Sequence, residues 1–305
     1  MSVTQQAIAV GRGYAQSRPA RRNWFGGLHG ADYVWAVAFA LPYAAIFFAF
    51  VVYPIGYGVW MGSDPALYKD LFSDPRYLTT VVNTLLYVAI GVNLKMFLAF
   101  MLSGFFMRKR WWSKTLLVVF ILPWATPALP AYMSIHWFLN GQWGMLNNIL
   151  YAVFGYDGPV YLNERWTGLM CNIAAYIWKT LPFWTIILLA GRMSVPQELY
   201  EAAAVDGANG IRKFAHITVP MMASLYLVCT LLDMVFALGD FNATYFVSGG
   251  GPAMSTEVLA TLGIRYAFTI AQPRLGVAAV MSALPLLIPL VILLMRRLRM
   301  SEGQL

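Results

Sequence analysis

Charged residues are scarce in this chain of 305 residues, since only 11% are Asp, Glu, Lys or Arg whereas 60% are hydrophobic. A soluble domain needs far more polar surface, so this composition and the mean hydropathy of +0.62 predict a polytopic membrane protein. The net charge is +8, but the basic residues do not gather on one segment. That distribution argues against nucleic-acid binding and points to membrane topology.

Several chemical signatures are also missing. The two cysteines, Cys171 and Cys229, both lie in apolar segments, so they indicate neither a disulfide framework nor a metal site. No G-x-x-x-x-G-K-[ST] phosphate loop is present, so we expect no ATP hydrolysis by this chain alone. Residues 1–30 lack the apolar core and cleavage site of a signal peptide. No constellation of His, Cys or carboxylates supports an integral-membrane enzyme.

Long apolar runs predict an all-α fold with six transmembrane helices. The expected spans cover residues 33–60, 79–106, 115–140, 167–191, 217–238 and 275–295. Pro123, Pro127 and Pro130 predict a kink in the third span. A short interfacial segment is expected at residues 264–268.

The basic residues predict the orientation of these spans. We expect a basic tail over residues 1–30, a six-span domain over 31–300 with a polar loop at 192–216, and a second tail over 301–305. Of the 21 Lys and Arg residues, fourteen fall in the tails, the 108–114 turn and the polar loop, five in the opposite loops and two inside spans. The positive-inside rule therefore places both termini and the polar loop in the cytoplasm.

The polar loop carries the most specific pattern in the chain. It reads E-A-A, three residues, G, nine residues, then I-x-V-P, formed by Glu201, Ala202, Ala203, Gly207, Ile217, Val219 and Pro220. The S-x-x-Q spacing from Ser194 to Gln197 predicts a capping box at the start of a helix over residues 196–206. Gly207 then permits a turn that residues with a Cβ resist, and Asn209 allows a helical restart. The alanines leave a smooth face that a partner surface can approach closely.

This spacing resembles the cytoplasmic signature of the permease subunits of ATP-binding-cassette importers, with Val219 where that family usually has Leu. The resemblance implies the type I importer permease fold and a coupling helix that sits in a groove of an ATPase subunit. It assigns the coupling role to Glu201, Ala202, Ala203, Asp206 and Gly207. It also implies no cofactor in this chain, because ATP and Mg are bound by a dimer of partner ATPase subunits.

Other motifs resemble the carbohydrate importers of the maltose type, in particular the first of their two permeases. These motifs are Asp74-Pro75-Arg76-Tyr77, Trp178-Lys179-Thr180-Leu181-Pro182-Phe183 and Gly249-Gly250-Gly251-Pro252 with Ser255-Thr256-Glu257. The resemblance implies a sugar or polyol substrate, a heterodimer with a second permease, and a prokaryotic cytoplasmic membrane location among its lipids. It further implies an extracytoplasmic solute-binding protein, for which the candidate contact loop is Gly249, Gly250, Gly251 and Pro252.

Three ionisable residues, Lys95, Lys179 and Asp233, fall inside expected spans. Such residues are costly in lipid, so they take functional or paired roles that face the bundle interior. Structural pairing is the favoured interpretation for Asp233 and for Lys95, whose side chain can also snorkel. For Lys179, pairing and substrate contact are equally good interpretations.

Sugar recognition needs flat apolar faces for stacking and hydrogen-bond partners for hydroxyl groups. The candidate substrate-path residues near the fourth and fifth spans are Asn172, Tyr176, Lys179, Trp184, Phe241, Asn242 and Tyr245. Asn172, Tyr176 and Lys179 share one helical face because they lie three or four residues apart. Asn242 departs from the acidic residue that many relatives carry there. His136 is expected to be satisfied structurally.

Two alternatives stay open. A permease for another polar solute, such as a polyamine or phosphate, would share the same cytoplasmic loop. An ion-driven secondary transporter would use Lys95, Lys179 and Asp233 as a proton relay and would need neither ATP nor a partner. The ordered coupling motif and the absence of a detectable repeat argue against the second alternative.

Overall fold

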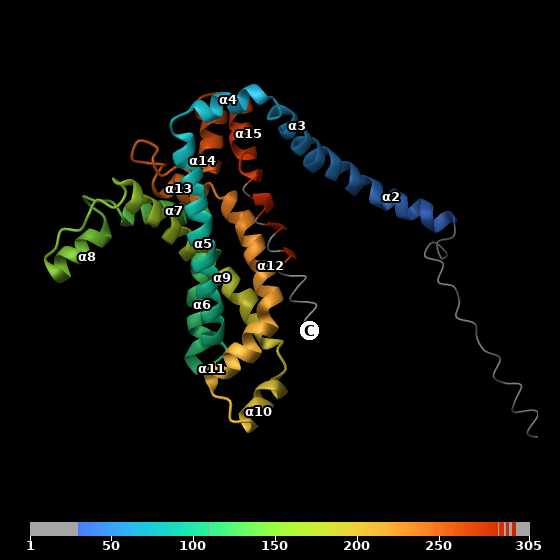
Figure 1. Cartoon of the computed structure of the whole chain (residues 1–305), viewed down its shortest axis with the longest axis vertical. Coiled ribbons are helices and arrows are strands. Elements are labelled where there is room, and N and C mark those ends of the chain that lie inside the picture. The colour runs from blue at the N-terminus through green and yellow to red at the C-terminus, as the bar shows by residue number, and fades with distance from the viewer. Residues whose placement is uncertain (1–29, 109, 286, 290, 293–294, 297–305) are drawn as a thin grey trace, which may run out of the picture. The chain divides into compact units, whose positions relative to one another are not determined.

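The computed structural model describes residues 30–296 except 109, 286, 290 and 293–294 (Figure 1). Within that part of the chain every regular element is helical, as the all-α prediction requires. The predicted tail over residues 301–305 and nearly all of the tail over residues 1–30 lie outside the described residues. The contacts divide the chain into two compact units, Met1–Tyr57 and Gly58–Leu305.

The first unit is described as one helical stretch, which consists of α2 (Gly30–Phe47), the π-helical turn η1 (Phe48–Val52) and the beginning of α3 (Tyr53–Met61). The wide turn ends just before Pro54, whose ring removes a regular helical hydrogen bond. Residues 33–61 are long and apolar enough to cross a membrane, as predicted for the first span.

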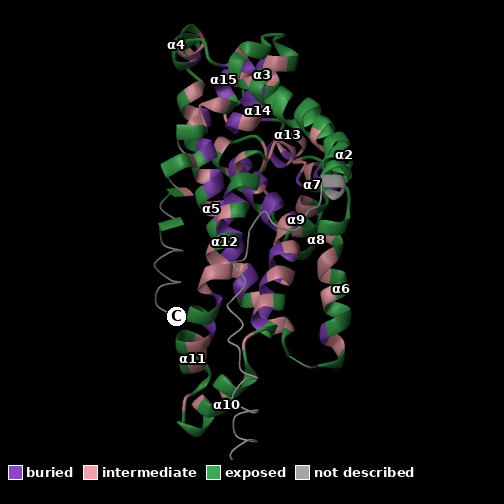
Figure 2. Ribbon diagram, turned by 90° about the vertical axis from the view of Figure 1, so that its right-hand side faces the viewer, coloured by how far each residue is buried: buried purple, intermediate pink, exposed green. Residues whose placement is uncertain are grey.

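Three long helices form the core of the second unit. α5 (Tyr77–Phe106) and α9 (Arg165–Met193) pack lengthwise, and α12 (Val219–Leu238) packs against both. Figure 2 shows the buried residues concentrated along these helices. The second, fourth and fifth predicted spans are therefore present, but the fifth begins earlier than predicted, because the candidate span covers residues 210–238.

The third predicted span is not one continuous helix. It consists of α6 (Trp111–Ala125) and α7 (Ala128–Phe138), whose axes differ by 96°. Thr126, between them, is extended with ψ 146°, because the ring of Pro127 disfavours helical backbone in the preceding residue. The prolines thus break the span rather than kink it.

The remaining elements of the second unit are short. They are α4 (Pro65–Ser73), α8 (Met145–Phe154), α10 (Gln197–Val205), α11 (Gly210–Lys213), η2 (Phe214–Thr218), α13 (Asn242–Val247), α14 (Leu259–Ile264), η3 (Arg265–Thr269) and α15 (Pro273–Met281). The interfacial segment predicted at residues 264–268 falls at the junction of α14 and η3. Both views place α4 at one end of this unit and α10 at the other (Figures 1 and 2).

The sixth predicted span is not recovered as one long helix. α15 ends at Met281 and a turn follows, after which the described residues up to Arg296 are helical except where the description is interrupted. Over the described residues, four helices are long and apolar enough to cross a membrane, or five if the bent pair α6 and α7 counts as one span.

Candidate coupling and substrate-path sites

The polar loop at residues 192–216, called the coupling loop after its expected role, folds as the helix-turn-helix that its sequence predicts. α10 covers residues 197–205, within one residue of the predicted helix at each end. Gly207 has a φ of +74°, a left-handed conformation that residues with a Cβ rarely adopt. The Asn209 side chain then accepts a hydrogen bond of 2.9 Å from the backbone N–H of Arg212 and caps α11.

The predicted capping box at the start of α10 is wrong. α9 extends to Met193, so Ser194 is the C-cap of that helix, and its hydroxyl donates to the carbonyl oxygen of Gly191 at 2.7 Å. Pro196 occupies the N-cap of α10 without a side-chain cap. Gln197 instead donates from Nε2 to Oε1 of Glu201 at 2.8 Å. The S-x-x-Q spacing is shared between two helices and caps neither in the predicted way.

The coupling loop presents an unpartnered surface. Of the residues assigned to coupling, Glu201, Ala202, Asp206 and Gly207 are exposed and Ala203 is half-buried. Two large apolar side chains in this loop, Val205 and Ile211, are 89% and 79% exposed. The motif residues alone did not indicate either of them, although apolar residues flanking a polar turn would have been a signal for a docking surface.

A direct contact connects the coupling helix to the long helices. The Tyr200 hydroxyl of α10 lies 3.0 Å from the Thr218 hydroxyl, at the end of η2. α11, η2 and α12 follow one another as one helical stretch over residues 210–238. α10 is therefore joined to the helical stretch that contains α12 by a side-chain contact as well as through the chain.

Lys95 and Asp233 form an ion pair inside the bundle. Lys95 Nζ lies 2.8 Å from Asp233 Oδ1, and both residues are 0% exposed. Nζ also donates to the Thr180 hydroxyl at 2.8 Å and lies 3.6 Å from the ring centroid of Tyr176. Pairing is thus confirmed for both charges, and snorkelling of Lys95 is wrong because its ammonium group points into the core.

Lys179 holds the broken helix in place. Its Nζ donates to the carbonyl oxygens of Pro123 at 2.9 Å, Trp124 at 3.3 Å and Thr126 at 2.5 Å. These carbonyls end α6 just before the break, where the helix has no further N–H donors for them. Since an ammonium group has three N–H donors, this geometry leaves none for a sugar hydroxyl.

The other candidate path residues on α9 face the interior of this chain. Asn172, Tyr176 and Trp184 are all buried. Asn172 Nδ2 donates to the Ser248 hydroxyl at 2.9 Å, and the Tyr176 hydroxyl donates to Asp233 Oδ1 at 3.1 Å. The face shared by Asn172, Tyr176 and Lys179 therefore ties α9 to its neighbours.

The candidates near the end of α12 have a different environment. Phe241 and Tyr245 stack with ring centroids 4.5 Å apart and line a cavity of about 730 Å³. The exposed aromatic side chains Trp137 and Phe268 line the same cavity, and sequence reasoning missed both. Asn242 begins α13 and does not line it.

His136 borders this aromatic cavity through a structural contact. Its Nδ1 lies 2.7 Å from the carbonyl oxygen of Val247, which confirms the expected structural role. This contact ties α7 to the end of α13.

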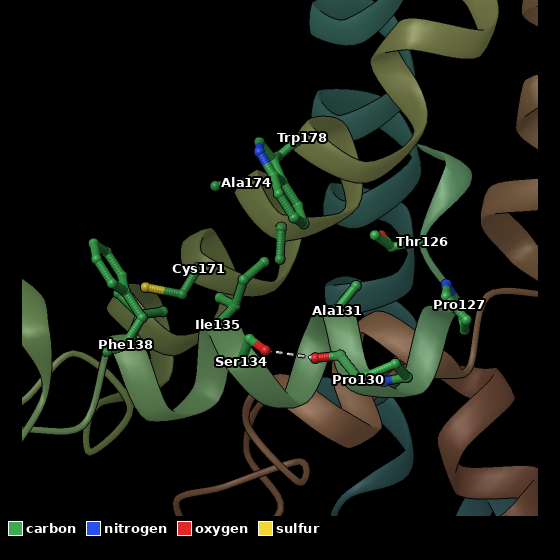
Figure 3. A pocket seen from close by; sticks show the side chains of 12 residues that line it. Thr126, Pro127, Pro130, Ala131, Ser134, Ile135, Phe138, Cys171, Ala174 and Trp178 are labelled. Atoms are coloured by element: carbon green, nitrogen blue, oxygen red, sulfur yellow. Dashed lines mark hydrogen bonds between the residues drawn. The ribbon is translucent and has the colours of Figure 1, made fainter. Parts of the chain in front are cut away.

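A second, apolar cavity of about 720 Å³ lies between α7, with the turn that precedes it, and α9 (Figure 3). Trp178 and Cys171 line it from α9, and Ile135 and Phe138 line it from α7. The Trp178 side chain therefore lies on the side of the bundle, whereas its neighbours in the same turn of α9 are buried.

The predicted binding-protein contact loop is held firmly on α5. Gly249 and Gly250 have φ angles of 63° and 78°, so the turn needs glycine at both positions. Asn83 Nδ2 donates to the carbonyl oxygens of Ser255 at 2.7 Å and Glu257 at 2.9 Å. The loop is thus a fixed surface at its base.

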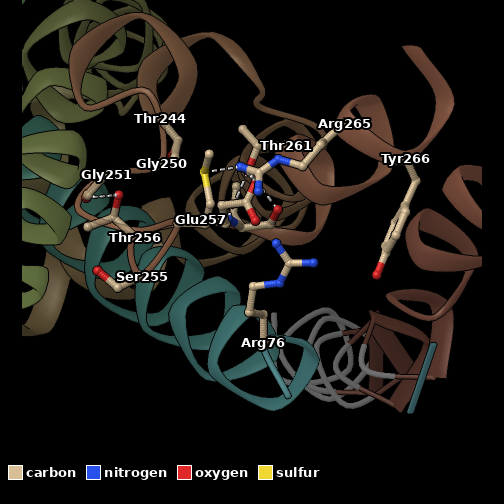
Figure 4. Close-up of polar contacts among 12 residues, drawn as sticks. Arg76, Thr244, Gly250, Gly251, Ser255, Thr256, Glu257, Thr261, Arg265 and Tyr266 are labelled. Atoms are coloured by element: carbon tan, nitrogen blue, oxygen red, sulfur yellow. Dashed lines mark hydrogen bonds and ion pairs between the residues drawn. The ribbon is translucent and has the colours of Figure 1, made fainter. Parts of the chain in front are cut away.

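A charged cluster lies beside this loop (Figure 4). Glu257 is buried and pairs with Arg265, while Arg76 also points toward it from the start of α5. Burial raises the pKa of Glu257 to about 7, against the opposing effect of the arginines. Burial also acts to raise the pKa of Asp74, but hydrogen bonds from Arg76 and Tyr266 lower it to about 2.

Comparisons with known proteins identify relatives of this chain. A family model described as "Binding-protein-dependent transport system inner membrane component" matches residues 95–300. The sulfoquinovosyl glycerol transport system permease protein SmoG of Agrobacterium fabrum is 30% identical over 255 residues, which cover 78% of this chain and 82% of the relative. The trehalose/maltose transport system permease protein MalF of Thermococcus litoralis is 33% identical over 148 residues, covering 48% of this chain and 50% of the relative.

Solved structures match the fold. A chain of a bacterial ABC transporter involved in the import of the acidic polysaccharide alginate superposes with a TM-score of 0.75 at 21% identity. The match covers 88% of this chain and 96% of the other. The helical arrangement described above is therefore shared with that chain.

Proposed function

The chain belongs to the family of binding-protein-dependent transport system inner membrane components, and from this premise we propose that it is one permease of an ATP-driven carbohydrate or polyol importer. It would form the translocation path with a second permease. A dimer of ATPase subunits would bind ATP and Mg, and an extracytoplasmic solute-binding protein would deliver the sugar. ATP hydrolysis belongs to the separate ATPase subunits, and this chain is a permease component, not an enzyme.

The single observation that carries the coupling role is the exposed helix-turn-helix at one end of the bundle. Val205 and Ile211 offer apolar surface beside Glu201 and Asp206, which suits a groove on another polypeptide. Tyr200 and Thr218 then connect this surface to α12. Closure of the ATPase subunits would move α10, and the long helices would follow as alternating access requires.

The proposed topology has six spans in the inner membrane of a prokaryote, with both termini in the cytoplasm. The distribution of basic residues supports it, since fourteen of 21 lie on the side of the coupling loop. The placement of α10 and α4 at opposite ends of the second unit also supports it (Figures 1 and 2).

The carbohydrate assignment is supported by the names of the relatives and by the aromatic cavity. Phe241, Tyr245, Trp137 and Phe268 offer flat apolar faces, which suit the faces of sugar rings. We therefore propose that these four residues, rather than the buried residues of α9, line the substrate path in this subunit.

Uptake by the purified assembly tests the function. The complex with its second permease, ATPase subunits and binding protein is reconstituted in vesicles, and ATP-dependent uptake is measured for sugars, polyols, polyamines and phosphate. The binding protein is screened with the same solutes for thermal stabilisation. Uptake and stabilisation by polyamines or phosphate alone would overturn the carbohydrate assignment, and uptake without ATP would overturn the coupling role.

A further inference from the structure

A large cavity of about 1170 Å³ lies beside the coupling helix and has no role in the transport cycle described above. Its walls are the turn after α5, the start of α6, the end of α9 and the start of α10. It is thus formed by elements that reach the membrane surface on the side of the coupling loop.

The walls of this cavity carry positive charge only. Arg108, Arg110, Lys114 and Arg192 line it, and no Asp or Glu is among the described lining residues. None of these four cations belongs to an ion pair within the described part of the chain. Four unneutralised cations around one cavity create a strong potential for an anion.

Two buried polar side chains in the cavity wall lack partners. Arg192 is only 7% exposed, and its Nε and Nη2 have no hydrogen-bond acceptor. Ser113 is 5% exposed and its hydroxyl is also unpartnered. The rings of Phe100 and Phe214, 5.0 and 5.7 Å from the guanidinium carbon, offset only part of the cost of burying this charge. These atoms are inaccessible as they stand, and a small rotation of either side chain toward the cavity would bring it to an anion with several acceptor oxygens.

Two helix starts reach the same cavity. α6 begins at Trp111 and α10 at Gln197, and neither has a side-chain cap on its first N–H groups. Free N–H groups at a helix start attract anions, phosphate in particular. They add to the unpartnered groups of Arg192 and Ser113.

The rest of the lining is apolar and interfacial. Leu117, Leu189 and Met193 supply its apolar lining, and Trp111, which also lines it, is 88% exposed. Trp and basic residues are enriched where helices leave the membrane. A free phosphate ion would use only the basic part, whereas a phospholipid would use both parts.

We propose that this cavity binds the phosphate headgroup of an anionic phospholipid, with an acyl chain along Leu117 and Leu189. The side of the membrane rests on the proposed topology, which makes it the cytoplasmic leaflet. The bound lipid would contact the end of α9 and the first residues of α10 together. Its occupancy would therefore steady the coupling helix relative to the bundle.

Lipid retention by the assembled transporter tests the site. The complex is extracted from membranes that contain phosphatidylglycerol and analysed by native mass spectrometry, as wild type and as the double variant Arg110→Gln and Lys114→Gln. Both residues are exposed, so folding should be unaffected. The matched control, Arg212→Gln with Lys213→Gln, removes two charges from the coupling loop outside the cavity.

We expect the wild type and the control to retain one more phosphatidylglycerol than the double variant. The affinity of the double variant for that lipid should be about thirty-fold lower, which corresponds to about 2 kcal/mol for two basic residues near an anionic surface. Equal retention by all three proteins would overturn the proposal. So would equal retention of phosphatidylcholine by the wild type, which would show that the negative headgroup is not recognised.

Two further arms separate other occupants of the cavity. Inorganic phosphate that binds at millimolar concentration to the lipid-free wild type but not to the double variant, and that leaves lipid retention unchanged, would show that the cavity is a free-anion site and would overturn the proposal. Retention by the permease pair that disappears on adding the ATPase subunits would show that a protein covers the cavity, and it would overturn the proposal as well. Sugar uptake is measured on the same samples, so a failure of the carbohydrate assignment is seen separately.

Discussion

The ion pair between Lys95 and Asp233 gives the sharpest test of how the bundle is held together. Both residues are 0% exposed and their charged groups lie 2.8 Å apart, so removing one partner leaves a buried charge without its counterion. Such changes cost about 3–5 kcal/mol, whereas replacing a whole buried pair by apolar residues of similar size is often neutral or stabilising. We expect Lys95→Met and Asp233→Leu each to lower the free energy of unfolding by about 3–5 kcal/mol, and the double variant to lower it by much less than either.

The permease pair is unfolded in mixed micelles by titration with SDS, and tryptophan fluorescence monitors the unfolding. Tyr176→Phe serves as a graded control, because it removes only the hydrogen bond from the Tyr176 hydroxyl to Asp233 and should cost about 1.5–3 kcal/mol. Additive costs in the double variant would refute the reasoning, since they would mean that the two charges do not interact.

The same variants decide between the structural role and a proton relay. A secondary transporter that uses Asp233 to carry protons would lose transport in every variant, including the double one. A purely structural pair predicts that the double variant keeps ATP-dependent uptake. Uptake lost in a double variant that is stable and fully assembled would favour the relay and contradict the structural role.

Three other residues carry predictions of their own. Gly207→Val should abolish ATP-dependent uptake while leaving assembly intact, because the backbone at residue 207 has a φ of +74°, which is strained for a residue with a Cβ. The control is Gly210→Val, which should keep uptake because φ at residue 210 is not positive. Lys179→Met should lower the thermal midpoint of the permease, because it leaves the carbonyls that end α6 without donors; a raised KM for sugar with unchanged stability would instead show substrate contact. Burial raises the pKa of Glu257 from 4.5 to about 7, so the folded loop binds a proton more tightly than the unfolded chain. Protection of residues 249–257 from hydrogen exchange, corrected for intrinsic rates, should therefore be greatest below pH 4.5 and fall as the pH rises to about 7. Glu257→Gln should remove this pH dependence. Protection that increases from pH 4.5 to about 7 in the wild type would contradict the prediction.

Short-range patterns predicted the coupling loop well because local chemistry determines it. Gly207 and Asn209 permit only a few backbone conformations, so the helix-turn-helix follows from neighbouring residues. The capping-box prediction was wrong because Ser194 lies between two helices. α9 extends to Met193, so Ser194 caps the end of α9 instead of the start of α10. The lengths of the first, second and fourth spans were predictable for the same local reason, since apolar runs are contiguous in sequence.

Contacts between residues far apart in the chain could not be predicted from the sequence. Helical periodicity correctly puts Asn172, Tyr176 and Lys179 on one face, but it does not say which helices that face meets. The structure turns it toward Ser248, Asp233 and the end of α6, which makes it a packing face. The prolines predicted a bend, yet its 96° angle is accompanied by the three hydrogen bonds from Lys179, a residue more than fifty positions away.

These contacts bear on which parts can move independently. Lys95, Asp233 and Tyr176 join α5, α12 and α9 through charged hydrogen bonds in a buried setting, where separating them would expose unpaired charge. In the proposed coupling, Tyr200 would pass a displacement of α10 to the beginning of α12, at one end of this group. A stiff group of three helices moved from one end rotates as a body, so the displacement at the aromatic cavity near Phe241 follows from the motion at α10 without any bending of the helices between them. Removing one partner of the buried pair should therefore uncouple ATP hydrolysis from transport before it prevents assembly, whereas the double variant leaves no unpaired charge and should keep transport.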